Sequence, residues 1–209
     1  MARKREPKQR EGNEIEFARI VAFSDGVFAI AITLLVLAIE IPARLHGESV
    51  GEALWDQHEN LLAYALSFAV IGRFWVVHHR FFSEVDAFDG RLLSLNLLYL
   101  GCIALIPFSS QVLGDYGGLT SSVVLYSVNL AAVVLVGLLM ALDARRAGLT
   151  TIDDRAHRET RIRGTYIAGV FLLSIPLAFV APSVAPYLWL LLFLDPASRL
   201  ADAASRGER

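Results

Sequence analysis

Cysteine is almost absent from this chain of 209 residues, in which Cys102 is the only thiol. One thiol can form neither an intramolecular disulfide nor a cysteine-rich metal cluster, so a disulfide-stapled domain is excluded. Because Cys102 lies in an apolar run, we expect it to be a small core hydrophobe. The sequence also lacks a phosphate-binding glycine loop, a dinucleotide fingerprint, a Ser-His-Asp arrangement and an HExxH motif. We therefore expect no enzyme activity, no cofactor and no metal site.

Charged residues are scarce in this sequence, and apolar residues are abundant. They make up 19% and 55% of the chain, respectively, and the mean hydropathy is +0.51. Because an ordinary soluble domain has an apolar share of roughly 45–50%, this composition indicates a membrane protein. The first apolar run follows a basic N-terminus and has no small-residue cleavage site after it, which predicts a retained membrane helix rather than a signal peptide.

Long hydrophobic runs divide the chain into spans. A spanning helix needs roughly 20 mostly apolar residues. Five segments of the chain meet this length directly. A sixth segment, at 184–200, is shorter, and its apolar core covers only 184–194. We predict that it also spans, with an interfacial segment as the alternative, which gives an all-α membrane protein with six transmembrane helices. The five segments that meet the length directly are at about 17–41, 57–80, 92–113, 120–142 and 164–181.

The distribution of Lys and Arg predicts the orientation. These residues are concentrated in the N-terminal arm, the second and fourth loops and the tail, whereas the third and fifth loops have none. This alternation follows the positive-inside rule and predicts that both termini are cytoplasmic. We expect residues 1–13 to be a disordered basic arm, 14–200 to be one membrane domain and 201–209 to be a cytoplasmic tail. The topology signal explains the basic arm without nucleic acid as a partner.

Polar side chains inside the apolar segments need a partner or a task, because their burial in hydrocarbon is costly. Asp25 lies near the cytoplasmic end of the first segment, and Trp75 and His78 lie near that end of the second. Asn96 is about one turn into the third segment, at a similar depth. We predict one hydrogen-bond network in which Asp25 accepts from His78 or from the Trp75 indole, and Ser24 and Asn96 satisfy the remaining groups. A proton relay through Asp25 and His78 is the functional alternative.

Three motifs contain these residues. The first segment opens with RIVAFSD, the second ends with FWVVHHRFF, and the third contains LLSLNLLYLGCIALIPFSS. In this order they resemble the transmembrane protein 175 family, the lysosomal potassium channels and their prokaryotic relatives, over about residues 15–112. Animal members carry two six-helix repeats and this chain has one, so it is similar to the prokaryotic form. The resemblance implies a set of residues that anchors the first helix, namely Arg19, Phe23, Ser24, Asp25, Trp75, His78 and Asn96.

The resemblance further implies a homotetramer in which the first helix lines a central pore and large apolar side chains form the narrowest point. Ile30, Thr33 and Leu37 are spaced i, i+3, i+7 and so share one helix face. By position from the motif, Ile30 corresponds to the constriction, with Thr33 and Leu37 as further layers. Taken alone, such a stripe usually indicates helix packing, and Thr33 can instead bond to a carbonyl one turn earlier.

The expected function is a potassium-permeable channel in a bacterial plasma membrane, with copies of itself, lipid and potassium ions as its partners. The sequence has no filter loop of the kind that replaces water with a ring of carbonyl oxygens. A ring of apolar side chains would instead form a narrow, partly dewetted gate, at which potassium sheds its water more readily than sodium does. Two further hypotheses stay open: a proton-conducting channel or proton-coupled transporter that uses Asp25 and His78, and a membrane scaffold or enzyme subunit without transport.

Overall fold

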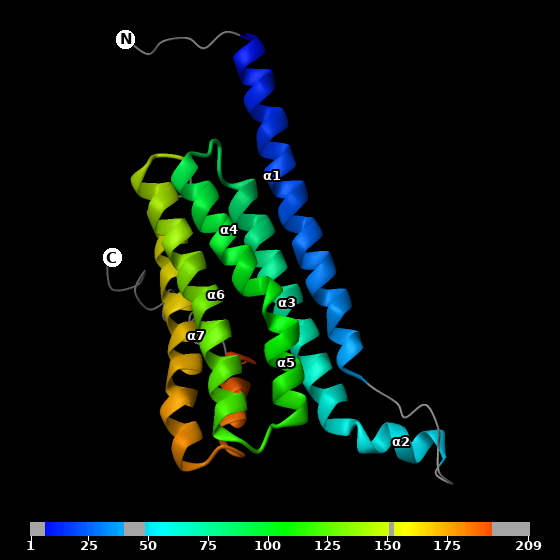
Figure 1. Cartoon of the computed structure of the whole chain (residues 1–209). Coiled ribbons are helices and arrows are strands. Elements are labelled where there is room, and N and C mark those ends of the chain that lie inside the picture. Colours follow the sequence, from blue (N-terminus) through cyan, green and yellow to red (C-terminus); the bar gives the residue numbers. More distant parts are fainter. Residues whose placement is uncertain (1–6, 40–48, 151–152, 194–209) are drawn as a thin grey trace.

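Helices make up almost all of the computed structural model, which describes residues 7–39, 49–150 and 153–193. The long helices run side by side as a bundle, with α1 along one edge and α2 projecting at one end (Figure 1). In chain order the elements are α1 (Pro7–Leu34), the 3-10 helix η1 (Leu35–Ala38), α2 (Val50–Asp56), α3 (His58–Ser83), α4 (Gly90–Ala104), α5 (Ile106–Asp115), α6 (Thr120–Arg146), α7 (Asp154–Val180) and the 3-10 helix η2 (Ala185–Phe193).

Five helical stretches in the described ranges are long and apolar enough to cross a membrane, which confirms an all-α multi-pass membrane protein. The last of them begins at Asp154 rather than near residue 164, because the charged sequence ahead of the apolar run continues the helix. Asp153 caps this start, since its side chain accepts from the Ala156 N–H at 2.7 Å. The five stretches are Ile15–Ala38, His58–Ser83, Gly90–Asp115, Thr120–Arg146 and Asp154–Val180.

The sixth predicted span is described only as far as Phe193, and this part is the short 3-10 helix η2. Nine residues of 3-10 helix rise roughly 18 Å, less than the hydrocarbon core of about 30 Å. Trp189 of η2 is buried against Tyr126 and Phe171, with ring centroids 5.0 and 6.3 Å away. The described part therefore packs against α6 and α7 instead of completing a span. Residues 194–200 and the predicted tail lie outside the described residues.

The first helix extends further toward the N-terminus than the sequence predicts. It begins at Pro7, so residues 7–13, expected to be part of a disordered arm, are helical, whereas residues 1–6 lie outside the described ranges. Proline suits the first turn of a helix, where its missing N–H has no carbonyl to bond. One stripe along α1 and the start of η1 faces the bundle at helical spacing, made of the buried residues Ser24, Phe28, Ala31 and Leu35.

The central helix of the bundle is α6, which packs against α4, α5 and α7. Its apolar window is 56% buried, against 22% for the first span, so α1 is peripheral in the isolated chain. Tyr126 of α6 is fully buried, and its hydroxyl lies 2.9 Å from the Ser67 hydroxyl of α3. Ser67 in turn donates to Ser110 of α5 at 2.8 Å. These three buried hydroxyls are therefore paired between helices, as a hydrocarbon surrounding favours.

The third predicted span is interrupted at Leu105, where α4 ends and α5 begins. Pro107 causes this break, because proline has no N–H to donate to the carbonyl four residues earlier. Asn129 of α6 reaches the break from the neighbouring helix. In the amide orientation that satisfies both of its polar atoms, its nitrogen donates to the Cys102 carbonyl at 3.0 Å and its oxygen accepts from the Ile106 N–H at 3.2 Å. The polar groups at the interruption are thus satisfied within the bundle.

The two arginine-rich loops lie at the same end of the bundle as the start of α1, an end called the basic end below (Figure 1). The loops contact each other, because the Asp86 N–H donates to the Leu149 carbonyl at 2.9 Å. Arg91 at the start of α4 forms an ion pair of 2.9 Å with Asp143 near the end of α6, whose side chain is only 9% exposed. The spatial grouping of these loops agrees with the alternation of basic residues along the sequence.

At the opposite end, the predicted first loop contains the short helix α2. Ser49 and Glu52 form a capping box at its start: the Ser49 N–H donates to the Glu52 carboxylate, and the Glu52 N–H donates to the Ser49 hydroxyl. Hydrogen bonds from Ser49, chiefly from its backbone N–H, hold the pKa of the Glu52 carboxyl below its usual value. This acidic residue therefore has a structural role in the loop.

Candidate pore surface and helix anchor

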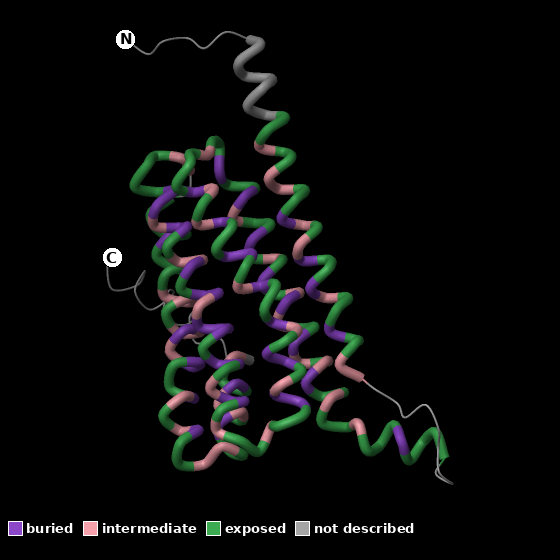
Figure 2. Tube along the Cα trace, in the orientation of Figure 1, coloured by how far each residue is buried: buried purple, intermediate pink, exposed green. Residues whose placement is uncertain are grey.

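One face of α1 is both apolar and exposed in the isolated chain. Ile30 and Leu37 are 61% and 67% exposed, and Thr33 between them is also exposed. Phe28 and Leu35 lie buried on the opposite face. Figure 2 shows the buried positions of this helix toward the bundle and the exposed positions on its other side. The three predicted pore residues thus share the face that turns away from the bundle, and their role in a pore stays a prediction.

The hydroxyl of Thr33 donates to the Ile30 carbonyl at 2.9 Å. This local bond is the alternative that the sequence left open for Thr33. Because Thr33 remains exposed, the lone pairs of its hydroxyl oxygen can still accept hydrogen bonds from water. The exposed face therefore has a polar position in the middle of an apolar helix.

The α-helix changes into the 3-10 helix η1 at Leu35. Residues i and i+3 eclipse each other in a 3-10 helix, which has three residues per turn. Leu37 consequently lies nearly in line with Leu34, which is 44% exposed. The i, i+3, i+7 pattern assumed a continuous α-helix and did not single out Leu34. The exposed apolar face therefore includes Leu34 as well as Leu37, about one turn apart along the helix axis.

A hydrogen bond between side chains attaches α1 to α3. The Trp75 indole Nε1 donates to the Asp25 Oδ1 at 2.8 Å. Of the two donors that the sequence offered for Asp25, His78 and Trp75, it is therefore Trp75 that forms the bond. The pair lies toward the surface of the isolated chain, since Trp75 is 39% exposed and Asp25 is half-buried. A hydrogen bond to an ionised carboxylate is stronger than one between neutral groups, so this pair is suited to fix the position of α1.

A second set of hydrogen bonds attaches α1 to α4 and, through α4, to α3. His78 Nε2 lies 2.8 Å from Asn96 Oδ1, and Asn96 Nδ2 donates to Ser24 Oγ at 3.0 Å. Ser24 Oγ donates to the Ile20 carbonyl at 2.9 Å. The three side chains are buried, with exposed fractions of 0–3%. They form a linear chain of hydrogen bonds between three helices.

The predicted single network is therefore two neighbouring sets. Within the described residues, no hydrogen bond joins Asp25 to Ser24 or to Asn96. Successive residues on an α-helix point about 100° apart, so Ser24 faces Asn96 of α4 while Asp25 faces Trp75 of α3. The helical rotation between positions 24 and 25 separates the partners of these two residues.

Aromatic rings enclose His78. The ring centroids of Phe28, Phe82 and Tyr99 lie 5.3, 4.7 and 5.4 Å from that of the imidazole. Because Asn96 presents its amide oxygen to the ring, His78 donates through Nε2. The other ring nitrogen, Nδ1, is buried without a hydrogen-bond partner among the described residues. This surrounding suits an imidazole that packs and donates one bond.

Two members of the predicted anchoring set lie apart from both hydrogen-bond sets. Arg19 is exposed, and Phe23 is 57% exposed. Neither side chain forms a hydrogen bond or ion pair with the rest of the described chain. Positions 19, 23 and 30 differ by four and seven residues, which places them on one helix face. The structure therefore groups Arg19 and Phe23 with Ile30 on the exposed face, and not with the anchor.

Metal ligands are not gathered at this site. Within the described ranges, no group of three or more His, Cys, Asp or Glu side chains could hold a metal ion. His79 stacks on Trp75, with ring centroids 5.6 Å apart, instead of joining the enclosed His78. The site therefore offers packing, hydrogen bonds and an exposed apolar face.

Known proteins have sequences similar to the part of the chain that contains this site. The family described as the endosomal/lysosomal potassium channel TMEM175 matches residues 19–107. That range includes the exposed face of α1, both hydrogen-bond sets and the break before α5.

Individual relatives extend the similarity beyond this range. A protein named as a potassium channel in Streptomyces collinus is 38% identical over 173 residues, 79% of this chain and 84% of that protein. The endosomal/lysosomal proton channel TMEM175 of Gallus gallus is 39% identical over 47% of this chain but only 21% of that protein. A crystal structure described as a lysosomal potassium-selective channel TMEM175 homolog from Chamaesiphon minutus has a TM-score of 0.73, with 31% identity over 88% of this chain and 97% of that chain.

Proposed function

The chain belongs to the TMEM175 family, and from this we propose that it is a potassium-permeable cation channel whose pore is lined by α1. Bacterial relatives of similar length are named potassium channels. The permeant ion is then potassium, and the channel needs neither a cofactor nor catalytic chemistry.

One observation carries the proposal: α1 is buried on one face and exposed on the other. Apolar exposure alone would suit lipid as well as a pore. The same exposed face, however, contains Arg19 near the basic end and the Thr33 hydroxyl in the middle of the helix. Ionisable and polar groups within membrane spans favour the interior of an assembly or a water-filled path over lipid. This combination supports a pore-facing surface.

The pore requires several copies of the chain, because a single helix cannot enclose a path for ions. We propose a homotetramer, as the family resemblance implies, with four α1 helices around a central axis. The rings of Ile30 and of Leu37 would then form narrow, apolar layers that hold little water. Potassium sheds its hydration water at a smaller cost than sodium, so such layers favour potassium without a carbonyl filter.

The two hydrogen-bond sets would hold α1 in place while ions pass along its other face. Trp75 fixes Asp25 from α3, and Asn96 fixes Ser24 from α4. Both lie on the basic-end side of Ile30. We propose that this end faces the cytoplasm of a bacterium, with both termini on that side and the channel in the plasma membrane.

Flux through purified protein in liposomes tests the proposal. Liposomes loaded with potassium are diluted into sodium buffer, and a proton-sensitive dye reports charge-balancing uptake, with a potassium ionophore as the positive control. We expect flux that falls when sodium replaces the internal potassium. Ile30→Asn should make the constriction more polar and weaken the preference for potassium, while the oligomer stays intact by light scattering.

A matched control separates the pore from the outer surface of the bundle. Leu173 of α7 is 65% exposed, close to the 61% of Ile30. Leu173→Asn places the same amide on a helix that does not line the proposed pore, so its selectivity should equal that of the wild type. Equal selectivity in Ile30→Asn and the wild type would contradict the pore assignment of α1.

A proton-conducting channel is the second candidate, because the animal relatives are named proton channels. It would use Asp25 and His78, but Asp25 bonds to Trp75 and His78 bonds to Asn96. A relay between them would need water to bridge the two sets. Proton-driven flux without potassium that disappears in Asp25→Asn would favour this candidate over a potassium channel. A complete lack of flux with any monovalent cation would favour a scaffold.

A further inference from the structure

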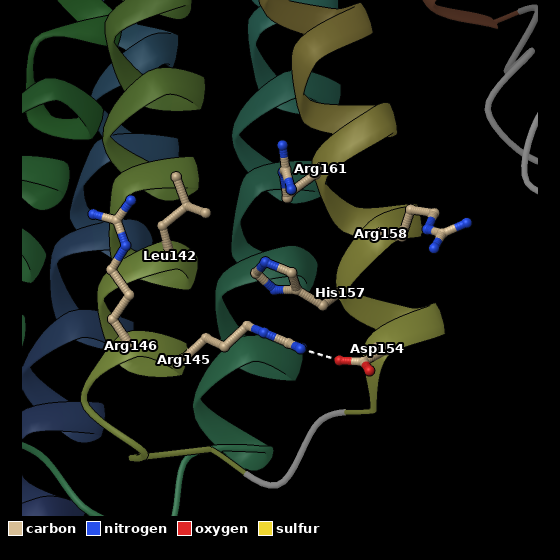
Figure 3. Close-up of a pocket in the computed structure, with 7 residues that line it drawn as sticks. All are labelled: Leu142, Arg145, Arg146, Asp154, His157, Arg158 and Arg161. Atoms are coloured by element: carbon tan, nitrogen blue, oxygen red, sulfur yellow. Dashed lines mark hydrogen bonds and ion pairs between the residues drawn. The ribbon is translucent and has the colours of Figure 1, made fainter.

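A cavity of about 480 Å³ lies between the basic-end turns of α6 and α7. Figure 3 shows it as a groove between the two helices, close to the loop that joins them. It is distant from the proposed pore, because α7 and α1 lie at opposite edges of the bundle (Figure 1). The lining residues are Leu142, Arg145, Arg146, Asp154, His157, Arg158 and Arg161.

The groove has two walls at helical spacing. Leu142 and Arg146 are four residues apart on α6, and His157 and Arg161 are four residues apart on α7, so each pair shares one helix face. His157 is buried, and its ring lies between the two helices in Figure 3. Arg145 crosses the mouth of the groove to reach Asp154 of α7. Arginines from both helices therefore border one open groove.

Positive charge in this groove exceeds negative charge. Four arginines and one carboxylate line it, a formal charge of +3 from these groups. The carboxylate, Asp154, is already paired with Arg145. The neighbouring carboxylates Asp143, Glu159 and Asp153 are each bound to another partner. Within the described residues, no carboxylate forms an ion pair with Arg146 or Arg161, so an anion entering the groove would meet these two guanidinium groups.

The depth of the groove matches the boundary of the membrane. The apolar runs of the sequence end at about residue 142 on α6 and begin at about residue 164 on α7. Leu142 thus borders the hydrocarbon side, whereas Arg146 and Arg161 lie on the aqueous side. Phosphate groups of lipids lie just outside the hydrocarbon core.

The positive-inside rule explains why this end is basic, but it requires only that the charges lie near the span ends. Here α6 and α7 continue as helices beyond their apolar runs. This extension brings Arg146 and Arg161 to opposite sides of one cavity. A guanidinium binds phosphate oxygens through paired, planar hydrogen bonds, and basic pockets between membrane helices on the cytoplasmic side bind lipid headgroups.

We propose that this groove binds a phosphate group, held between Arg146 of α6 and Arg161 of α7 with Arg145 at the mouth. A lipid headgroup of the cytoplasmic leaflet and soluble phosphate present the same chemistry to these guanidinium groups. With a lipid, the first acyl carbons would lie beside Leu142. The site joins the two helices that close the bundle on the side away from α1.

Binding to the purified full-length chain tests this proposal without any measurement of ion flux. Native mass spectrometry in detergent compares retention of phosphatidylglycerol with that of phosphatidylcholine, and equilibrium dialysis with labelled inorganic phosphate tests the soluble source. We expect either phosphatidylglycerol or inorganic phosphate to bind. Arg146→Gln and Arg161→Gln should each weaken that binding about tenfold, because each removes one charge-assisted contact.

Arg80→Gln is the matched control. Arg80 lies in the last turn of α3 at the same end of the bundle and does not line the groove, so this variant removes the same charge elsewhere. Arginine-dependent retention of phosphatidylglycerol identifies a lipid as the ligand, and arginine-dependent binding of inorganic phosphate identifies a soluble one. The proposal is overturned if neither probe binds, if either groove variant binds like the wild type, or if Arg80→Gln weakens binding equally.

Discussion

The Trp75 indole donates to the Asp25 carboxylate at 2.8 Å, across the contact between α3 and α1. The adjacent residue, Ser24, accepts from Asn96 of α4 at 3.0 Å. Two consecutive residues of α1 are therefore attached to two different helices. Because their side chains point about 100° apart, the pair of bonds fixes the rotation of α1 as well as its position. The rotation so fixed turns Ile30 away from the bundle.

Trp75→Phe tests the first of these attachments. An aromatic ring is retained and the indole N–H donor is lost, so the Asp25 carboxyl group loses this partner. Because the pair is partly exposed, we expect a loss of about 1 kcal/mol of stability, the usual net value of one hydrogen bond. Thermal unfolding of the purified protein measures it. Trp55→Phe is the control, because Trp55 on α2 is 74% exposed; equal unfolding temperatures in the two variants would contradict the assigned role.

Removal of the carboxylate should affect the assembly more than conduction. In Asp25→Ala, the end of α1 near the basic end loses its bond to α3, so we expect a smaller fraction of intact oligomer in size-exclusion chromatography with light scattering. If the oligomer is as stable as the wild type and only conduction changes, Asp25 acts in the ion path and not as an anchor.

Asn96→Ala tests the buried set. Asn96 is 1% exposed and bonds both His78 and Ser24, so its removal leaves the buried His78 ring without a hydrogen-bond partner among the described residues, whereas Ser24 keeps its bond to the Ile20 carbonyl. We expect a loss of about 2–4 kcal/mol, from the unpaired ring and the cavity together. Ser94→Ala is the control, since the exposed Ser94 bonds only to the Gly90 carbonyl of its own helix. In the double variant Asn96→Ala with Ser24→Ala, the loss of stability should be smaller than the sum of the losses in the two single variants.

Hydropathy and charge pattern predict much of this fold. Runs of apolar residues set the five long spans, because hydrocarbon accepts few other residues, and the alternation of arginines groups the basic loops at one end. The start of α7 was placed about ten residues too late, since hydropathy reports the apolar run and not the helix, which continues past it once Asp153 caps its start.

The sequence identifies polar residues that could bond to one another, but it does not show which of them do. Asp25, His78 and Asn96 stand out as polar residues at one depth, but the rotation of each helix decides which of them meet. The change to a 3-10 helix at Leu35 left no signal in the periodicity, so Leu34 was missed. Asn129 was visible as a polar residue in an apolar run, but its partner is a break in another helix, which no spacing on α6 can reveal.

Asn129→Leu tests that contact. The leucine keeps the volume and removes the amide that bonds the Cys102 carbonyl and the Ile106 N–H at the break before Pro107. Two buried backbone groups then lose a partner, so we expect a loss of about 2–3 kcal/mol in thermal or denaturant unfolding. Ser109→Ala, which removes a single hydroxyl next to Asn129, should cost less. An equal or larger loss in Ser109→Ala would show that Asn129 does not stabilise the break.

The Thr33 hydroxyl distinguishes a water-lined face of α1 from a lipid-facing one. Thr33→Val keeps the shape of the side chain and removes the only bond that the hydroxyl makes in the described structure, to the Ile30 carbonyl of its own helix. We therefore expect the unfolding temperature to stay the same. In a pore, four valines would replace the polar ring between two apolar layers, and stronger dewetting should lower the potassium flux.

Thr165→Val on α7 is the matched control for this prediction, because Thr165 is also exposed within a span but lies on a helix far from α1. The loss of its hydroxyl should leave both stability and flux unchanged. If Thr33→Val lowers the liposome flux and Thr165→Val does not, the exposed face of α1 is in contact with the permeant ion or its water. If both variants conduct like the wild type, the hydroxyl of Thr33 serves only its own helix, and the path for ions lies elsewhere in the assembly.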